Sequence, residues 1–259
     1  LRKASDNSVY EETLERETIT EETVSSVTLS AYPGTVYMHI SSFTETTSSD
    51  FAAHYNKLLN QGEIENLILD LRSNGGGNFY ACIAIGEYFV PLNEMVVSEK
   101  TSSGSEEHRS SSGQLNGLNV IVLQNAYTAS ASEVLIGALK DKADATLIGT
   151  TTYGKGITQS IVMLESGSGH RYTRSIYYTP SGFSLNGIGL EPDILVEDPA
   201  DTTYDDYFSL DPAKNPHLQA ALNYLFPDGP PSAEESSDGT TTDDTNSGEA
   251  STDETTGEN

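Results

Sequence analysis

Residues 119–142 read Asn-Val-Ile-Val-Leu-Gln-Asn-Ala-Tyr-Thr-Ala-Ser-Ala-Ser-Glu-Val-Leu-Ile-Gly-Ala-Leu-Lys-Asp-Lys, and this stretch decides the fold. It opens with a short apolar run at 119–123, which is typical of a strand that is buried on both faces. The pattern at 131–142 predicts a helix directly after that strand. Because similar strand and helix patterns alternate along the chain, the sequence predicts a layered α/β core.

Hydrophobic patterns predict the remaining elements. Alternating residues from 157 to 179 predict β-structure with a hairpin turn at 166–169. The stretch from 98 to 118 is rich in Ser, Glu and Gly and is expected to form a loop. The other predicted elements are strands at 36–40, 66–71 and 146–149, helices at about 50–60 and 79–89, and a last amphipathic helix that carries Leu218, Ala221, Leu222 and Leu225.

The composition limits the class of protein. A chain of 259 residues with 36% hydrophobic residues can form one large domain or two small ones. The 39 acidic residues far outnumber the 13 basic ones, which argues against nucleic acid or an anionic membrane surface as a partner. Residues 227–259 are acidic and have almost nothing to bury, so they are predicted to form a disordered tail. The single cysteine, Cys82, excludes an internal disulfide.

Two residues near the strand and helix quoted above are candidates for a catalytic role. Ser130 lies at the mouth of the predicted helix, whose first amides lack intrahelical partners. Lys155 lies between two glycines, which leave room for its stem to turn into a site. A hydroxyl needs a nearby base to become a nucleophile, and a desolvated neutral lysine can serve. The pattern indicates a serine–lysine hydrolase, although an N-cap serine and a solvated loop lysine are the structural alternatives.

Several ordered motifs resemble the C-terminal processing peptidases, also called tail-specific proteases. The nucleophile turn of that family, Asn-x-x-Ser/Thr-Ala-Ser-Ala-Ser-Glu, matches residues 125–133 throughout. Its base motif, Thr-Phe-Gly-Lys-Gly-x-x-Gln, matches residues 152–159 with Tyr in place of Phe. Its Asp-Leu-Arg-x-Asn-Pro-Gly-Gly motif matches residues 70–77 with Gly in place of Pro. Two shorter motifs match at 178–182, without the family's extra residue before Thr, and at 189–193.

The resemblance implies a fold and a domain organisation. The fold would be a crotonase- or ClpP-like spiral of ββα units, with a serine protease core at 25–226. Residues 1–24 would be the end of a truncated PDZ domain, and a solvated acidic arm is the alternative. The chain begins at Leu1 without a Met or a signal peptide, so any membrane anchor is expected only in an absent N-terminal segment.

The resemblance also implies a role for each site residue. Ser130 would attack a peptide carbonyl and form an acyl-enzyme, and Lys155 would take the hydroxyl proton and return it to the leaving amine. Gln159 would orient the lysine amine. The amides of Gly76 and Ala131 would form the oxyanion hole, in which preorganised donors stabilise the developing negative charge.

The implied partners are protein or peptide substrates, engaged near their C-termini in an extracytoplasmic bacterial setting, and self-association is left open. No cofactor or metal is implied. The alternative function is a catalytically inactive binding module on the same fold, for an apolar ligand or a peptide. A third possibility is a structural domain displayed at the surface.

Other motifs give weaker indications. Glu133 is expected to be structural, because an acid in the first turn of a helix interacts favourably with the helix dipole. A phosphate-binding loop is disfavoured because Gly156 occupies the place of the required Ser or Thr. No His-x-x-x-His or paired-cysteine spacing predicts a metal site. No recognisable catalytic triad surrounds any of the five histidines, which are His39, His54, His108, His170 and His217.

Overall fold

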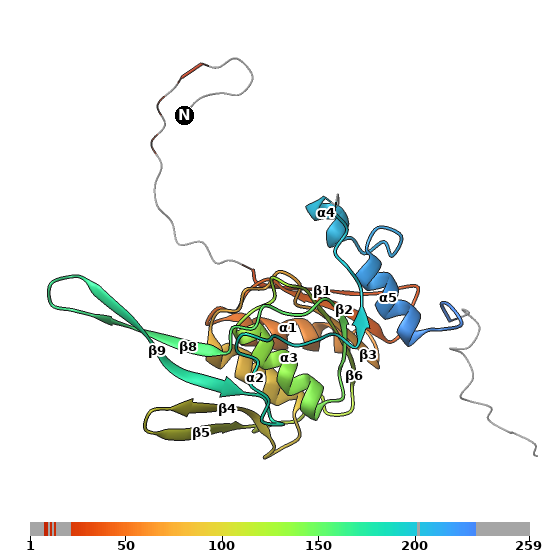
Figure 1. Cartoon of the computed structure of the whole chain (residues 1–259). Helices are drawn as coiled ribbons and strands as arrows, with labels where there is room; N and C mark the ends of the chain where they lie inside the picture. The colour runs from red at the N-terminus through yellow and green to blue at the C-terminus, as the bar shows by residue number, and fades with distance from the viewer. Residues whose placement is uncertain (1–7, 10, 12, 14–21, 201–202, 232–259) are drawn as a thin grey trace, which may run out of the picture.

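A parallel sheet forms the centre of the protein, seen in a computed structural model that describes residues 8–9, 11, 13, 22–200 and 203–231 (Figure 1). Its six strands follow the order β1-β2-β3-β6-β7-β10, and only the edge pair β1–β2 is antiparallel. The strands are β1 (Val24–Thr28), β2 (Thr35–Ile40), β3 (Asn66–Asp70), β6 (Asn119–Gln124), β7 (Thr146–Gly149) and β10 (Ile194–Leu195).

Helices cover both faces of this sheet. Alternate residues of a strand point to opposite faces, so Leu69 and Val122 join a core cluster with the long helices α1, α2 and α3. Ile68 and Ile121 face the other way and pack in a second cluster with Leu222 of α5. The helices are α1 (Thr47–Leu59), α2 (Phe79–Phe89), α3 (Ala131–Lys142), α4 (Tyr204–Tyr207) and α5 (Pro216–Leu225).

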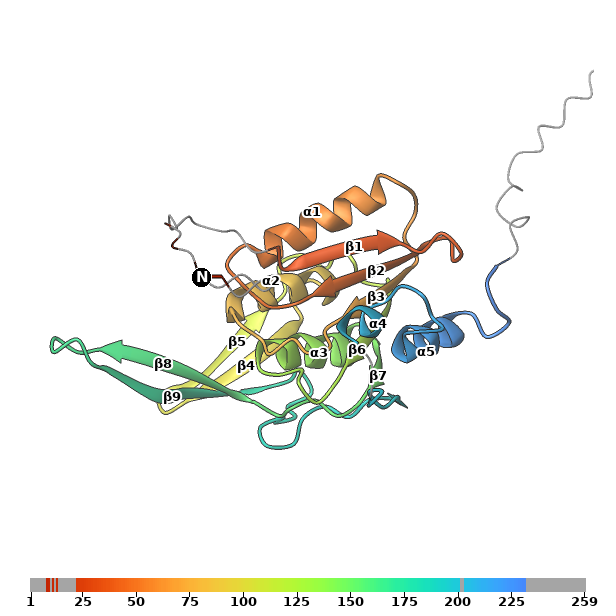
Figure 2. The same cartoon turned by 90° about the horizontal axis from the view of Figure 1, so that it is seen from above.

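A second, antiparallel sheet of four strands in the order β5-β4-β9-β8 lies beside the parallel one. Figure 2 shows that the hairpin of β8 and β9 projects far from the body of the protein. The strands are β4 (Met95–Thr101), β5 (Gly104–Arg109), β8 (Ile157–Met163) and β9 (Gly169–Tyr178). The predicted β-structure and hairpin between 157 and 179 are confirmed.

The loop predicted at 98–118 is wrong over its first half, because the end of β4 and all of β5 lie there. Five of the six residues of β5 are exposed, so the strand carries no alternation of apolar and polar residues that would reveal it. The other predicted strands and helices are confirmed to within a few residues.

The two ends of the chain receive only a partial description. Most of the predicted arm at 1–24 and most of the predicted tail at 227–259 fall outside the described residues. Among the residues that are described, no helix is both long and apolar enough to cross a membrane.

Candidate active site

The backbone is strained at Ser130, where β6 passes into α3. This residue has φ 62° and ψ −120°, a conformation that costs a residue with a side chain about 1–3 kcal/mol. A sharp strand-to-helix turn of this kind holds a side chain out from the end of the sheet. It also places the Ala131 amide at the start of α3, where no acceptor within the described residues takes its hydrogen.

Glu133 ties this turn to the lysine loop. Its side chain is completely buried, and Oε2 accepts hydrogen bonds from the amides of Ser130 and Lys155, each at 2.8 Å. Oε1 accepts bonds from the Gly154 amide and the Thr152 hydroxyl, each at 2.6 Å. The structural role expected for Glu133 is confirmed. The carboxylate does more than interact with the start of a helix, because it also binds the backbone of the lysine loop on the other side of the site.

The Asn74–Gly77 loop packs directly against the turn at Ser130. The Asn74 carbonyl accepts bonds from the Ala129 amide at 3.0 Å and the Ser132 hydroxyl at 2.9 Å. Gly76 has φ 96°, and a Cβ there would lie only 2.8 Å from the Cβ of Ser130. Glycine is therefore required at position 76 for both its conformation and its close approach to Ser130.

Two glycines of this loop differ in what their amides bond to, which bears on the predicted oxyanion hole of Gly76 and Ala131. The amide of Gly76, predicted for this role, donates to the Asn74 side chain at 2.9 Å and would have to release or share that bond. The amide of Gly77 donates to no acceptor within the described residues, and Gly77 lines the pocket beside Ser130.

A pocket of about 330 Å³ brings four of the five predicted site residues together, namely Ser130, Ala131, Lys155 and Gln159. Gly76, the fifth, adjoins Ser130 without lining the pocket. The remaining lining residues are Gly77, Phe79, Ile157, Thr158, Ile161, Arg171 and Tyr177.

The predicted side-chain contacts of the lysine are not formed. Lys155 is half-buried and Gln159 is exposed on β8, beside a register shift between Thr158 and Gln159. Within the described part of the chain, the lysine ammonium has no hydrogen-bond partner. The Ser130 hydroxyl bonds with the hydroxyl of Tyr177 at 3.2 Å instead.

Tyr177 is a site residue that the sequence does not single out. It lies on β9, is 1% exposed, and stacks on Phe79 with a distance of 5.7 Å between the ring centroids. Burial raises the pKa of Tyr177 to about 12, so the phenol is neutral at pH 7 and cannot serve as the base for Ser130. The alternation along β9 could have placed Tyr177 on the same inner face as Ser175, but it gives no sign of the contact with Ser130.

A buried ion pair anchors the end of β3, from which the Asn74–Gly77 loop departs. The guanidinium of Arg72 lies 2.6 Å from the carboxylate of Asp70, and both side chains are inaccessible to solvent. Burial acts most strongly and would raise the pKa of Asp70, but the charge of Arg72 and the hydrogen bonds that Asp70 accepts together outweigh it, so the pKa is lowered. Arg72 also donates to Asn215 at 3.2 Å, which joins α5 to the same anchor.

Comparison with known proteins identifies the class. The sequence profile of Peptidase family S41 matches residues 34–196, and the chain belongs to that family, which comprises serine proteases. A carboxy-terminal-processing protease of Bartonella bacilliformis is 38% identical over 66% of this chain and 41% of that protein. The chloroplastic C-terminal processing peptidase of Tetradesmus obliquus is 34% identical over 62% of this chain and 35% of that protein.

Solved structures agree with this assignment. The photosystem II D1 C-terminal processing protease is similar with a TM-score of 0.61 and 32% identity, over 70% of this chain and 50% of that one. An S41 protease homologue of Bacteroides fragilis shares the fold with a TM-score of 0.65 at 17% identity, over 81% of this chain and 59% of that one. The resemblance to C-terminal processing peptidases is thereby confirmed, and the fold is a mixed α/β fold of the S41 type. The chain spans less than half of the length of the curated relatives described above.

Proposed function

We propose that this chain is the catalytic core of a serine endopeptidase that uses Ser130 and Lys155 as a dyad. One observation carries the proposal. Ser130 is held in a strained turn whose amide shares the Glu133 carboxylate with the amide of Lys155, and both residues line one pocket. Strain at a polar residue is retained where the surrounding structure supports it, and functional sites are where it concentrates.

The reaction follows from these positions. Lys155 Nζ, in its neutral form, takes the proton of the Ser130 hydroxyl while Oγ attacks a peptide carbonyl. The amide of Ala131 and a glycine amide, from Gly76 or Gly77, stabilise the oxyanion. The lysine then returns the proton to the leaving amine, and water hydrolyses the acyl-enzyme.

Two side chains support the dyad. Because Tyr177 keeps its proton, its hydroxyl holds the position of Oγ without competing with the lysine as a base. The Lys155 side chain is half-buried and unbonded within the described residues, so it is free to turn toward Oγ when a substrate excludes water. Gln159 lines the same pocket and would orient the amine in that state.

The finer features of the family extend the proposal. The sheets and helices would form a crotonase- or ClpP-like spiral of ββα units. Substrates would be proteins or peptides cleaved near their C-termini, in keeping with the names of the relatives. An extracytoplasmic bacterial location goes with this role, although the relative from Tetradesmus obliquus is chloroplastic.

A catalytically inactive binding module is the second candidate. One observation favours it: Ser130 bonds with a neutral tyrosine, and no hydrogen bond within the described residues joins it to Lys155. A pocket that only binds a peptide does not require the Lys155 amine. The two candidates therefore predict different results when peptide cleavage is measured.

The test is cleavage of an unstructured protein, followed by mass spectrometry of the products. Wild type should produce fragments and Ser130→Ala should produce none, while Ser102→Ala serves as the matched control because that serine is exposed and does not line the pocket. Equal fragment yields from wild type and Ser130→Ala would refute the nucleophile. Binding without cleavage by wild type would favour the second candidate.

A further inference from the structure

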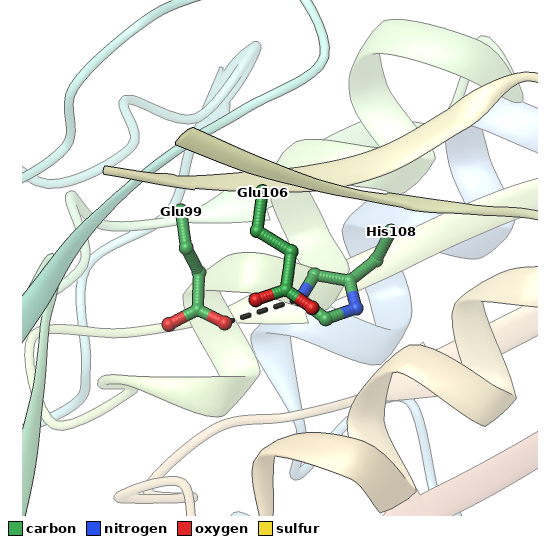
Figure 3. Close-up of side chains that lie close together, drawn as sticks. All are labelled: Glu99, Glu106 and His108. Carbon is green, nitrogen blue, oxygen red and sulfur yellow. Dashed lines mark hydrogen bonds and ion pairs between the residues drawn. The ribbon is translucent and has the colours of Figure 1, made fainter. Parts of the chain in front are cut away.

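Three potential metal ligands converge on one face of the β4–β5 hairpin, outside the pocket described above. Glu99 of β4 lies directly opposite Glu106 of β5, and His108 follows two residues later on the same face. One ligand atom from each of the three residues lies within 4.8 Å of the other two. Figure 3 shows the two carboxylates and the imidazole pointing toward one another.

The charges in this cluster are poorly balanced by the protein itself. Like charges directly opposite one another on antiparallel strands are destabilising. The side chain of Glu99 is only 8% exposed, which increases the cost of an unbalanced charge. Lys100 and Arg174 line the adjacent hollow, but within the described residues neither forms an ion pair with Glu99 or Glu106.

The surroundings orient these ligands as a metal site requires. One carboxylate oxygen of Glu99 accepts a hydrogen bond from the Ser175 hydroxyl, which leaves the other oxygen facing Nε2 of His108 at 3.1 Å. The His108 ring lies edge-on to Phe79, with 5.5 Å between centroids, so packing restrains its plane. Supporting contacts of this kind hold ligating side chains in position and are part of the design of metal sites.

We propose that Glu99, Glu106 and His108 bind a divalent transition-metal ion, for which Zn²⁺ is the best match. Two carboxylates and one imidazole supply two negative charges and a nitrogen ligand, a set that suits Zn²⁺ better than Mg²⁺ or Ca²⁺, which prefer oxygen alone. Neighbouring ligand atoms of a tetrahedral Zn²⁺ lie about 3.4 Å apart. The 3.1 Å between Glu99 and His108 is close to that value, so the exposed side chain of Glu106 makes the main adjustment.

The site is accessible and its chemistry balances. Glu106 and Ser175 line a hollow of about 790 Å³ between the β4–β5 turn and β9, through which an ion and a water ligand can enter. A hydrogen bond to the Glu99 carboxylate requires a proton on Nε2 of His108. A neutral imidazole has one ring proton, so the ion binds at Nε2 when that proton moves to Nδ1, and the ring releases no net proton. This inference does not depend on the proposed peptidase activity.

The test is calorimetric titration of the chelator-treated chain with Zn²⁺, with excess Mg²⁺ present to occupy weak acidic sites. Wild type should bind one ion at this cluster. Glu106→Gln and His108→Gln should each weaken binding by at least about tenfold. The matched control is Glu107→Gln, one residue from both ligands, on the opposite face of β5 and paired with Arg109; it should bind as wild type does.

A second measurement separates loss of ligands from loss of fold. Zn²⁺ should raise the melting temperature of wild type and of Glu107→Gln, and it should not raise that of the two ligand variants. Without the ion, the ligand variants should still unfold cooperatively as wild type does, so that loss of the Zn²⁺ effect reports lost ligands and not a lost fold. No binding by wild type, or unchanged affinity in both ligand variants because the ion sits on other acids of the chain, would overturn the proposal.

Discussion

The two walls of the pocket are held in different ways. The nucleophile wall, formed by Ser130 and Ala131, lies at the junction of a buried strand and a buried helix, and the amide and hydroxyl of Ser130 are bonded to Glu133 and Tyr177. The lysine wall, formed by residues 155–159, leads into a projecting hairpin and leaves the side chains of Lys155 and Gln159 unbonded within the described residues. The Glu133 carboxylate accepts hydrogen bonds from backbone amides of both walls. The two walls therefore differ in how their side chains are held and not in how their main chain is held.

This difference predicts which substitutions change both the stability and the activity of the protein and which change the activity alone. Changes at Glu133 should affect both, because a buried carboxylate with four donors supports the fold as well as the site. Changes on the lysine wall should affect activity alone, because a half-exposed side chain without partners adds little to stability.

The largest effect is expected from Lys155→Ala. Removal of the proposed base should lower kcat/KM by about three orders of magnitude or more, as loss of a dyad or triad member does. The free energy of unfolding should change by less than about 0.5 kcal/mol. Peptide cleavage and urea unfolding measure the two quantities, and Lys57→Ala on the exposed face of α1 is the control. A large loss of stability would contradict the contrast between the walls.

Glu133→Gln should break the nucleophile wall. The amide of glutamine has one acceptor oxygen, and its NH₂ group would face donors that the carboxylate now satisfies. The free energy of unfolding should fall by roughly 3 kcal/mol, together with activity. Urea unfolding checks this against Glu165→Gln, an exposed glutamate in the β8–β9 turn. If both variants were equally stable, Glu133 would not be the link between the walls.

Protonation of His217, a buried residue of α5, should make the stability of the protein depend on pH. Burial, aided by the charge of Arg72, lowers the pKa of His217 to about 4, below the value of about 6.5 in an unfolded chain. Between these values the unfolded chain binds more protons, so stability should fall by about 2 kcal/mol as pH drops from 7.5 to 5.

This pH dependence should become shallower in His217→Gln. It should persist in His170→Gln, because His170 is exposed on β9. Urea unfolding at several pH values measures the slopes, and the same slope in both variants would show that another group is responsible.

The smallest effect is expected from Gln159→Ala. The side chain is exposed and would act only by orienting the lysine, so kcat should fall about tenfold or less with no change in melting temperature. Gln114→Ala is the control, because that residue is exposed and does not line the pocket. A loss as large as that of Lys155→Ala would mean that Gln159 takes a direct part in proton transfer.

The sequence predicts the parallel core well because its signal is local. Strands such as 66–70 and 119–124 are buried on both faces and therefore read as continuous apolar runs. The prediction missed β5 for the opposite reason, since an exposed strand has no alternation of apolar and polar residues. The convergence of Glu99, Glu106 and His108 was hidden with it, because the register of that hairpin brings the three together.

The features of the site also divide into those that the sequence predicts and those that it does not. Motifs at 125–133 and 152–159 locate Ser130 and Lys155, and the structure places both at one pocket. The contact of Tyr177 with Ser130 and the bond from Gly76 to Asn74 depend on how segments meet in space and on local side-chain geometry. The motifs therefore predict which segments line the pocket, while the structure shows which of their atoms are hydrogen-bonded.

The most direct measurement of the central claim is labelling by a serine-directed fluorophosphonate, followed by intact mass and peptide mapping. This probe reports the reactivity of the hydroxyl without the need for a natural substrate. Wild type should gain one adduct on Ser130, Lys155→Ala should be labelled far more slowly, and Ser130→Ala should not be labelled. Labelling of Lys155→Ala at the wild-type rate, or of another residue in Ser130→Ala, would contradict the serine–lysine dyad.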